Sequence, residues 1–305
     1  MLAFLLGLPA VLAAQPRDRT VLAMGTRLSL HLEGPGDLEK ASEAALDESA
    51  RIESACSTWN PASAWSGLNA AGGRPVPLAR EWLDLLGTAQ AWQVRTGGAF
   101  DPVLMALMRV WDIRGGGGHR PTPEAVSRAL RASGSRLLVL DRRAGTARLR
   151  DSAAGVEEGG FLKGYALDRM RVVAGTPSGL LDFGGQLLAW GRPVEASVAD
   201  PRDRRRARLS LHLKDASLAC SGTSERGRHL LDPRTGRRCP AWGSVAVVAP
   251  DGLTADILST ALYVLGPDQG LAWADRHRTA AAFLLNDGTI RESTAFRSLN
   301  PKELP

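Results

Sequence analysis

The chain has 305 residues, of which 44% are hydrophobic and 23% charged, so it is long enough to bury a substantial core. Its net charge is +6, but the basic residues are scattered along the sequence. The densest basic run, residues 202–208, leads into alternating apolar residues and is typical of a solvated hairpin loop. No nucleic-acid-binding motif accompanies it, so we expect no nucleic-acid partner.

The first 14 residues are apolar and end in small residues, which is typical of a secretory signal with its cleavage site. This segment is too short to cross a bilayer. We therefore expect residues 1–14 to be removed on export, and residues 15–305 to form a single periplasmic domain. The alternative is a cytoplasmic protein with a frayed N-terminus.

The N-terminal third alternates predicted strands and helices. Alternating apolar residues over 20–32 predict a strand pair or one bulged strand. Apolar residues at helical spacing predict helices over 37–56 and 78–96, joined by a loop at 57–77. Glycines after residue 96 end the second helix, and a short helix to Trp111 is expected next.

The remaining two thirds continue this alternation. In chain order we expect a helix over 123–133, a hairpin over 137–149, a helix over 164–173, strands over 179–212, helices over 256–264 and 266–277, and a closing strand over 280–285. The strand–helix–strand rhythm of a parallel sheet is absent. The sequence therefore predicts an α+β fold with mixed, largely antiparallel sheets flanked by helices.

The most informative stretch is 255–262, where an acid and a hydroxyl stand four positions apart at the start of a predicted helix. Asp256 and Thr260 share one helical face, so their oxygens can converge on one point. Hard oxygen ligands of this kind are what Mg²⁺ prefers. Aspartate is also a common helix-start residue, so this pair taken alone favours a structural role over a metal site.

Polar and glycine-rich clusters stand at the ends of several other elements, where functional sites usually lie. In the stretch 157–166, glycines let the backbone approach a ligand, and Lys163 adds positive charge at a helix start. Together with the pair of Asp256 and Thr260, these clusters predict a site for a phosphorylated ligand.

In their order, the clusters resemble the FAD:protein FMN transferase family, the ApbE-like flavin transferases, from about residue 20 to residue 286. The matching strings are His-x-x-Asp-Pro-Arg-Thr-Gly at 229–236, Ala-Asp-x-x-x-Thr-Ala-Leu at 255–262, Gly-Gly-x-x-Lys-Gly-Tyr-Ala-x-Asp at 159–168, Met-Gly-Thr at 24–26 and Thr-Gly-Gly-Ala-Phe-Asp-Pro at 96–102. The resemblance implies a flavin site in a cleft between two halves of the chain.

The resemblance also implies a reaction. FMN would pass from FAD to a Thr or Ser hydroxyl of an acceptor flavoprotein of electron-transfer type, which can be membrane-associated, and AMP would be released. Gly160, Asp256 and Thr260 would ligate Mg²⁺, which offsets the charge of the pyrophosphate. His229 is the candidate general base, beside Asp256 as a second catalytic residue. We expect Asp256 to face the surface and to add little to stability.

Contacts with FAD are carried over from the resemblance to these positions: Met24, Trp59, Ala99, Phe100, Asp101, Glu157, Lys163 and Leu230. Trp59 is suited to stacking on a flat ring system, and Lys163 to binding phosphate. Each has a structural alternative, which is core packing for Trp59 and the capping of a turn for His229.

The sequence departs from the family strings in three places. Glu157 and Glu158 stand where Asp-Leu is usual, which adds an acid near the metal, and the substrate loops at 63–66 and 221–226 also differ.

Two alternative functions remain open. One is a Mg²⁺-dependent FAD pyrophosphatase, in which water replaces the acceptor hydroxyl. The other is a non-catalytic flavin-binding protein, against which the intact His229 and Asp256 argue.

Overall fold

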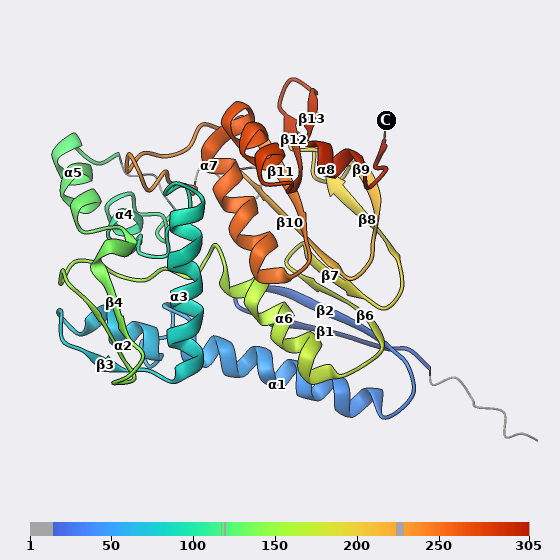
Figure 1. Ribbon diagram of the computed structural model, residues 1–305, viewed down its shortest axis with the longest axis horizontal. Coiled ribbons are helices and arrows are strands. Elements are labelled where there is room, and N and C mark those ends of the chain that lie inside the picture. The colour runs from blue at the N-terminus through green and yellow to red at the C-terminus, as the bar shows by residue number, and fades with distance from the viewer. Residues whose placement is uncertain (1–14, 117, 119, 224–228, 305) are drawn as a thin grey trace, which may run out of the picture.

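The fold is organised around an eight-stranded antiparallel sheet with the order β1-β2-β6-β7-β10-β11-β12-β13 (Figure 1). The computed structural model describes residues 15–116, 118, 120–223 and 229–304, so the predicted signal at 1–14 lies outside the described residues. The strands are β1 (Arg17–Ala23), β2 (Thr26–Glu33), β6 (Ser178–Phe183), β7 (Gln186–Trp190), β10 (Ala216–Gly222), β11 (Gly243–Ala249), β12 (Ala280–Leu285) and β13 (Ile290–Glu292).

Helices cover one face of this sheet and a second sheet covers the other. Because successive strand residues point to opposite faces, Val245 and Val247 of β11 pack with Leu258 of a covering helix. Ala246, which lies between them, packs with Leu211 of the second sheet. The covering helices are α1 (Leu38–Cys56), α6 (Leu162–Ala174) and α7 (Gly252–Arg276), and the second sheet has the order β14 (Lys302–Glu303), β9 (Ala207–Leu213), β8 (Val194–Ala199).

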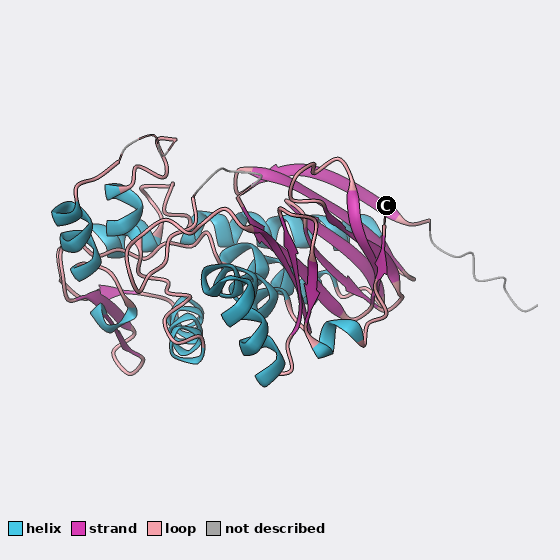
Figure 2. Cartoon of the chain, turned by 90° about the horizontal axis from the view of Figure 1, so that it is seen from above, coloured by secondary structure: helices cyan, strands magenta, loops and turns pink. Residues whose placement is uncertain are grey.

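The other elements form a smaller part at one end of the molecule, whereas the eight-stranded sheet and the sheet of β14, β9 and β8 lie at the opposite end (Figures 1 and 2). These elements are α2 (Ala64–Ala70), α3 (Arg80–Arg95), α4 (Met105–Val110), α5 (Pro123–Arg131), the 3₁₀ turn Ser135–Leu137 and the sheet of β3 (Val76–Pro77), β5 (Thr146–Leu149) and β4 (Leu138–Asp141). A short helix α8 (Thr294–Arg297) lies beside β12. Across the described ranges, no helix is both long and apolar enough to cross a membrane.

The predicted α+β class with largely antiparallel sheets is confirmed, since every strand pairing described is antiparallel. The predicted strand pair is the hairpin β1–β2, whose turn residues Met24 and Gly25 both have positive φ, 44° and 72°. Two positive φ values are what a tight two-residue hairpin turn needs. The predicted break between the last two helices is also confirmed, because Gly266 interrupts α7 with φ 76° and ψ 173°.

The loop predicted at 57–77 is wrong, because it contains the helix α2 and the short strand β3. Ser63 caps α2 by accepting a hydrogen bond from the backbone N–H of Ser66. Trp65 and Leu68 are buried, but two buried residues within seven are too few to produce a helical period in the sequence.

Glu48 ties α1 to α6 through a network of ion pairs. Its carboxylate accepts hydrogen bonds from the Nε atoms of Arg51, at 2.7 Å, and Arg169, at 3.0 Å. Hydrogen bonding by Arg51, followed by that of Arg169, outweighs burial and lowers the pKa of Glu48 to about 2. The ionised form is therefore favoured in the folded chain relative to the unfolded one.

We expect Glu48→Gln to lower the free energy of unfolding by about 1–3 kcal/mol near neutral pH. Because the folded pKa lies below the unfolded value, the stabilisation is present above about pH 4.5 and is lost as the pH falls towards about 2. Urea unfolding across this range measures it, with the exposed Glu43→Gln on the same helix as control. A Glu48→Gln curve parallel to the wild-type curve in acid would contradict the assignment.

Candidate active site

The first turns of α6 and α7 touch through their backbones. A Cβ atom on Gly164 would lie 2.2 Å from the carbonyl oxygen of Gly252, and one on Gly252 would lie 2.4 Å from the carbonyl oxygen of Gly164. Distances this short leave no room for any side chain at either position. The two glycines therefore allow the helices to meet where both begin.

Each helix supplies a carboxylate to the first turn of the other. Asp168 of α6 accepts hydrogen bonds from the backbone N–H groups of Gly252, at 2.6 Å, and Leu253, at 2.9 Å. Asp256 of α7 accepts one from the N–H of Gly164, at 3.0 Å. These N–H groups have no partner within their own helices, so the exchange satisfies them. Burial raises the pKa of Asp168 to about 6 in spite of its two bonds.

Asp256 is buried, with 7% of its surface exposed, so the expectation that it faces the surface is wrong. Its bond to Gly164 draws the carboxylate inward against α6. A charged residue at a helix start suggests exposure when the sequence is considered alone, but the glycine contact brings a second helix over it.

Gly160 lies against Thr260, one helical turn beyond Asp256. A Cβ atom on Gly160 would lie 3.3 Å from Oγ1 of Thr260 and 3.4 Å from Cε2 of Phe100. The three predicted metal ligands thus belong to one region of the structure. They offer a carboxylate, a hydroxyl and a backbone carbonyl, an all-oxygen donor set that fits Mg²⁺. Within the described residues, no three His, Cys, Asp or Glu side chains gather in a metal-binding arrangement.

Glu157 and Lys163 lie on either side of the same turn. Glu157 accepts a hydrogen bond from the N–H of Gly159 at 3.0 Å, and Lys163 Nζ donates to the Gly159 carbonyl at 3.4 Å. Burial, together with the neighbouring carboxylate of Glu158, raises the pKa of Glu157 to about 7. A phosphorylated ligand at this turn would meet the ammonium group of Lys163 at the N-terminus of α6.

Met24 and Trp59 are placed by the C-terminal end of α1. The backbone N–H of Met24 donates to Oε2 of Glu53 at 3.0 Å, which holds the strained turn with its φ of 44°. Trp59 follows α1 and is 66% exposed, so it is not a core residue. Its neighbour Thr58 donates its N–H to Oε1 of Glu158 at 3.0 Å, which connects Trp59 to the turn beside Gly160.

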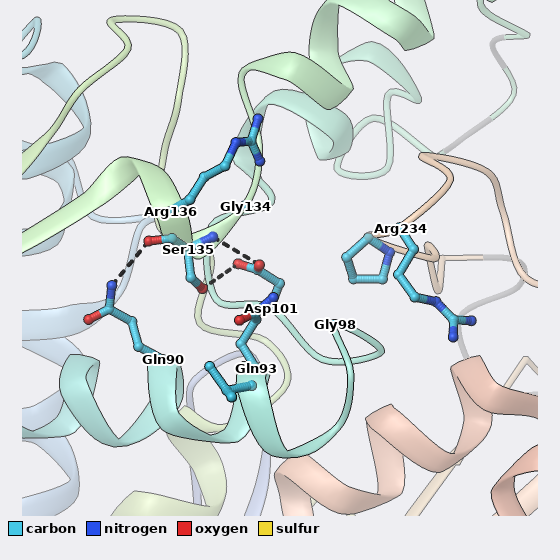
Figure 3. A pocket seen from close by; sticks show the side chains of 10 residues that line it. Gln90, Gln93, Gly98, Asp101, Gly134, Ser135, Arg136 and Arg234 are labelled. Atoms are coloured by element: carbon cyan, nitrogen blue, oxygen red, sulfur yellow. Dashed lines mark hydrogen bonds between the residues drawn. The ribbon is translucent and has the colours of Figure 1, made fainter.

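Ala99 and Phe100 are buried, and the Phe100 ring packs edge-on against Phe161, with centroids 5.9 Å apart. Asp101 is also buried and uses its carboxylate internally. It accepts hydrogen bonds from Ser135 N, at 2.9 Å, and from Ser135 Oγ, at 2.8 Å (Figure 3). It accepts a third from Val103 N, at 2.8 Å. Burial raises its pKa. The side chain of Asp101 therefore fixes a turn, which leaves the backbone of this stretch as the part suited to a ligand.

Asp101 also borders a cavity of about 360 Å³ that opens between α3 and a loop before β11 (Figure 3). The cavity is lined by Gln90, Gln93, Val94, Gly98, Asp101, Gly134, Ser135, Arg136, Pro233 and Arg234. The cavity thus lies between segments more than 90 residues apart in sequence. Of the predicted site residues, Asp101 alone is among those that line it.

His229 and Leu230 stand at the base of that loop. The loop is closed by hydrogen bonds from Cys239 N to the Leu230 carbonyl, at 2.9 Å, and from Asp232 N to the Arg237 carbonyl, at 2.8 Å. His229 is half-buried. The Asp-Pro-Arg-Thr-Gly string forms the loop's turn, and its residues Pro233 and Arg234 reach the cavity wall opposite Asp101.

Residues 24–284 match the ApbE family. The chain belongs to the ApbE family. It is 29% identical over 268 residues to the FAD:protein FMN transferase of Treponema pallidum, covering 76% of this chain and 73% of that one. It is 26% identical over 269 residues to a FAD:protein FMN transferase of Klebsiella pneumoniae, covering 81% and 76%.

Solved structures of the family share the fold. The ApbE protein of Thermotoga maritima matches with a TM-score of 0.86 and 27% identity, over 93% of this chain and 99% of that one. The flavinyl transferase ApbE of Pseudomonas stutzeri, in its apo form, matches with a TM-score of 0.85 and 26% identity, over 95% and 98%.

Sequence reasoning gave no role to Asp168, Thr58 or Arg114. Asp168 stands within a matched string, and that match was the signal that could have marked it as a site residue. Arg114 precedes a run of glycines, and nothing in the local sequence indicates its partners. Both residues act on segments distant in sequence, which periodicity and spacing do not reveal.

The glycine contact gives a direct test. We expect Gly252→Ala to lower the free energy of unfolding by about 3 kcal/mol, because the clash is with backbone that cannot rotate away. Gly67→Ala is the matched control, since a Cβ atom there meets nothing within 4 Å and alanine favours a helix by about 0.5–1 kcal/mol. Thermal or denaturant unfolding measures both, and equal stability of Gly252→Ala and wild type would refute the close approach.

Proposed function

We propose that this chain transfers FMN from FAD to a Thr or Ser hydroxyl of a protein acceptor and releases AMP. Family membership and relatives named FAD:protein FMN transferase support this function. The structural observation that supports it is the α6–α7 crossing, where Asp256 bonds to Gly164 and Thr260 lies against Gly160, so that Gly160, Asp256 and Thr260 would offer one all-oxygen site.

The finer part of the proposal is that the reaction depends on Mg²⁺. Asp256, the hydroxyl of Thr260 and the carbonyl of Gly160 would hold the ion. When bound, it supplies positive charge that offsets the charge on the pyrophosphate oxygens of FAD. Three protein donors leave coordination positions for phosphate oxygens and water, as is usual for Mg²⁺ in sites for phosphorylated substrates.

Residues of the chain would bind the flavin ring and the phosphates and accept the proton. Trp59 offers an exposed flat surface to the flavin ring, and Lys163 binds phosphate at the α6 N-terminus. The acceptor oxygen attacks the phosphorus of the FMN moiety, and the bond from that phosphorus to the bridging oxygen breaks, so AMP leaves with the electron pair. His229 takes the proton that the acceptor hydroxyl loses.

We also propose that residues 1–14 direct export and that the acceptor is a periplasmic or membrane-associated electron-transfer flavoprotein. The apolar segment with its terminal small residues supports this proposal. N-terminal sequencing of the native protein distinguishes it from a cytoplasmic protein that retains Met1.

The function is tested by incubating the protein with FAD, Mg²⁺ and an FMN-binding acceptor domain. We expect a fluorescent covalent flavin on the acceptor, one AMP per flavin, and no reaction in EDTA. Asp256→Asn should lower the rate by at least about 10²-fold, because it removes the ligand's charge but keeps an oxygen for Gly164 N–H. Asp251→Asn, the same change at the cap of the same helix, should keep activity because asparagine also caps helices.

Other outcomes would assign the protein differently. Full activity in EDTA or in Asp256→Asn would exclude the proposed metal site. Release of AMP and free FMN with no labelled acceptor would identify a pyrophosphatase. FAD binding with no turnover at all would identify a non-catalytic flavin-binding protein.

The division of roles between His229 and Lys163 can be measured separately. We expect His229→Ala to lower kcat by about 10²–10⁴-fold with little change in FAD affinity, since the base acts only as the proton leaves. Lys163→Ala should weaken FAD binding first, because a phosphate contact exists in the ground state too. Flavin fluorescence titration beside a gel assay separates them. If His229→Ala binds FAD poorly but turns over normally at saturation, the base lies elsewhere, with Asp256 the next candidate.

A further inference from the structure

Arg114 lies in the turn after α4 and reaches the loop that carries Trp59. Its guanidinium carbon lies 4.2 Å from the centroid of the Trp59 ring. In another stacked pair of the chain, the guanidinium carbon of Arg95 lies farther from the centroid of the Trp92 ring, at 4.8 Å. One face of an otherwise exposed indole is therefore covered by a cation.

The same guanidinium hydrogen-bonds to Thr58 in that loop. One terminal nitrogen of Arg114 donates to the carbonyl oxygen of Thr58 at 3.1 Å, and the other donates to the hydroxyl of Thr58. The residue before Trp59 is thus held at two points by a planar group with a fixed geometry. The stacking and the hydrogen bonds together fix where the indole ring lies.

Thr58 extends this connection to the turn that holds Gly160. Its hydroxyl accepts from Arg114 and donates to Glu158, whose other oxygen accepts the N–H of Thr58 at 3.0 Å. The carbonyl of Glu158 accepts hydrogen bonds from Phe161 N, at 3.1 Å, and Leu162 N, at 3.0 Å, at the start of α6. The ring of Trp59 is therefore fixed relative to the turn beside the proposed metal site.

We propose that Arg114 is a positioning residue that orders Trp59 as a stacking platform for the isoalloxazine ring of FAD. It acts through Trp59 and Thr58 and does not touch the reacting atoms. The proposal rests on the proposed function, since it requires FAD as the substrate. Because Trp59 is 66% exposed, the indole surface not covered by Arg114 remains open to a flat ligand.

This role has a specific energetic consequence. A platform for the ring is used equally in the ground state and the transition state, so its loss should raise the Kd and KM for FAD and leave kcat at saturation unchanged. A cation that acted directly on the phosphates would also weaken FAD binding. The two cases differ in whether the effect of Arg114 needs Trp59.

The test is a double-mutant cycle on the full chain, read by flavin fluorescence titration at constant Mg²⁺. We expect Arg114→Ala to weaken FAD binding by about 3- to 30-fold, the range for a cation–π contact. In a Trp59→Ala background the same change should have less than about a two-fold effect. Because a stacked indole quenches flavin emission, both single variants should leave the bound flavin brighter than in wild type. Arg95→Ala, which removes an arginine stacked on a different tryptophan, is the control and should bind FAD as wild type does.

The remaining outcomes overturn the proposal. Unchanged FAD affinity in Arg114→Ala excludes any role in binding, and an equal loss in both backgrounds assigns Arg114 to the phosphates. A fall in kcat at saturating FAD places it in the chemical step. If wild type itself binds no FAD, the proposed function fails; if wild type binds FAD and the cycle shows no coupling, only the role of Arg114 fails.

Discussion

The backbone contact between Gly164 and Gly252 is the constraint on which the candidate site depends. Without side chains at these positions, α6 and α7 approach closely enough for each to satisfy the first-turn N–H groups of the other. Asp168 bonds to α7 and Asp256 bonds to α6, so the two helix starts are held by reciprocal carboxylates. A shift of either helix would break both sets of bonds, and it would separate Gly160 from Thr260.

This arrangement also sets the electrostatics of the site. The carboxylate of Asp256 is buried, which costs free energy unless positive charge or hydrogen bonds compensate. The N–H of Gly164 and the N-terminus of α6 supply part of that compensation, and a divalent cation would supply more. The same helix start carries Lys163, so the proposed phosphate contact and the proposed metal ligands would both depend on the first turn of α6. The close packing that stabilises the crossing and the chemistry of the site therefore have one origin.

Much of the fold could be predicted from local patterns, and the failures at the candidate site have a common cause. The hairpin at Met24, the break at Gly266 and the antiparallel sheets follow from alternation and turn residues. The burial of Asp256 could not be predicted, because it depends on a glycine 92 residues away in sequence. The matched strings marked Asp101, but its partner Ser135 lies 34 residues further on, so its structural use was not visible. The pattern within one segment predicts which of its faces is apolar. It does not predict which other segment packs against that face.

The departure at Glu158 shows how the protein accommodates an extra acid beside the proposed metal site. The family strings that this sequence resembles have leucine there, and a buried carboxylate is costly without partners. Thr58 gives Glu158 two hydrogen bonds, and a guanidinium nitrogen of Arg114 lies 3.9 Å from its Oε2. Its negative charge is thus compensated by Thr58 and Arg114, which lie on the side of the Trp59 loop. Asp256 remains the carboxylate one helical turn from Thr260, so the added acid changes the link to the Trp59 loop rather than the proposed metal ligands.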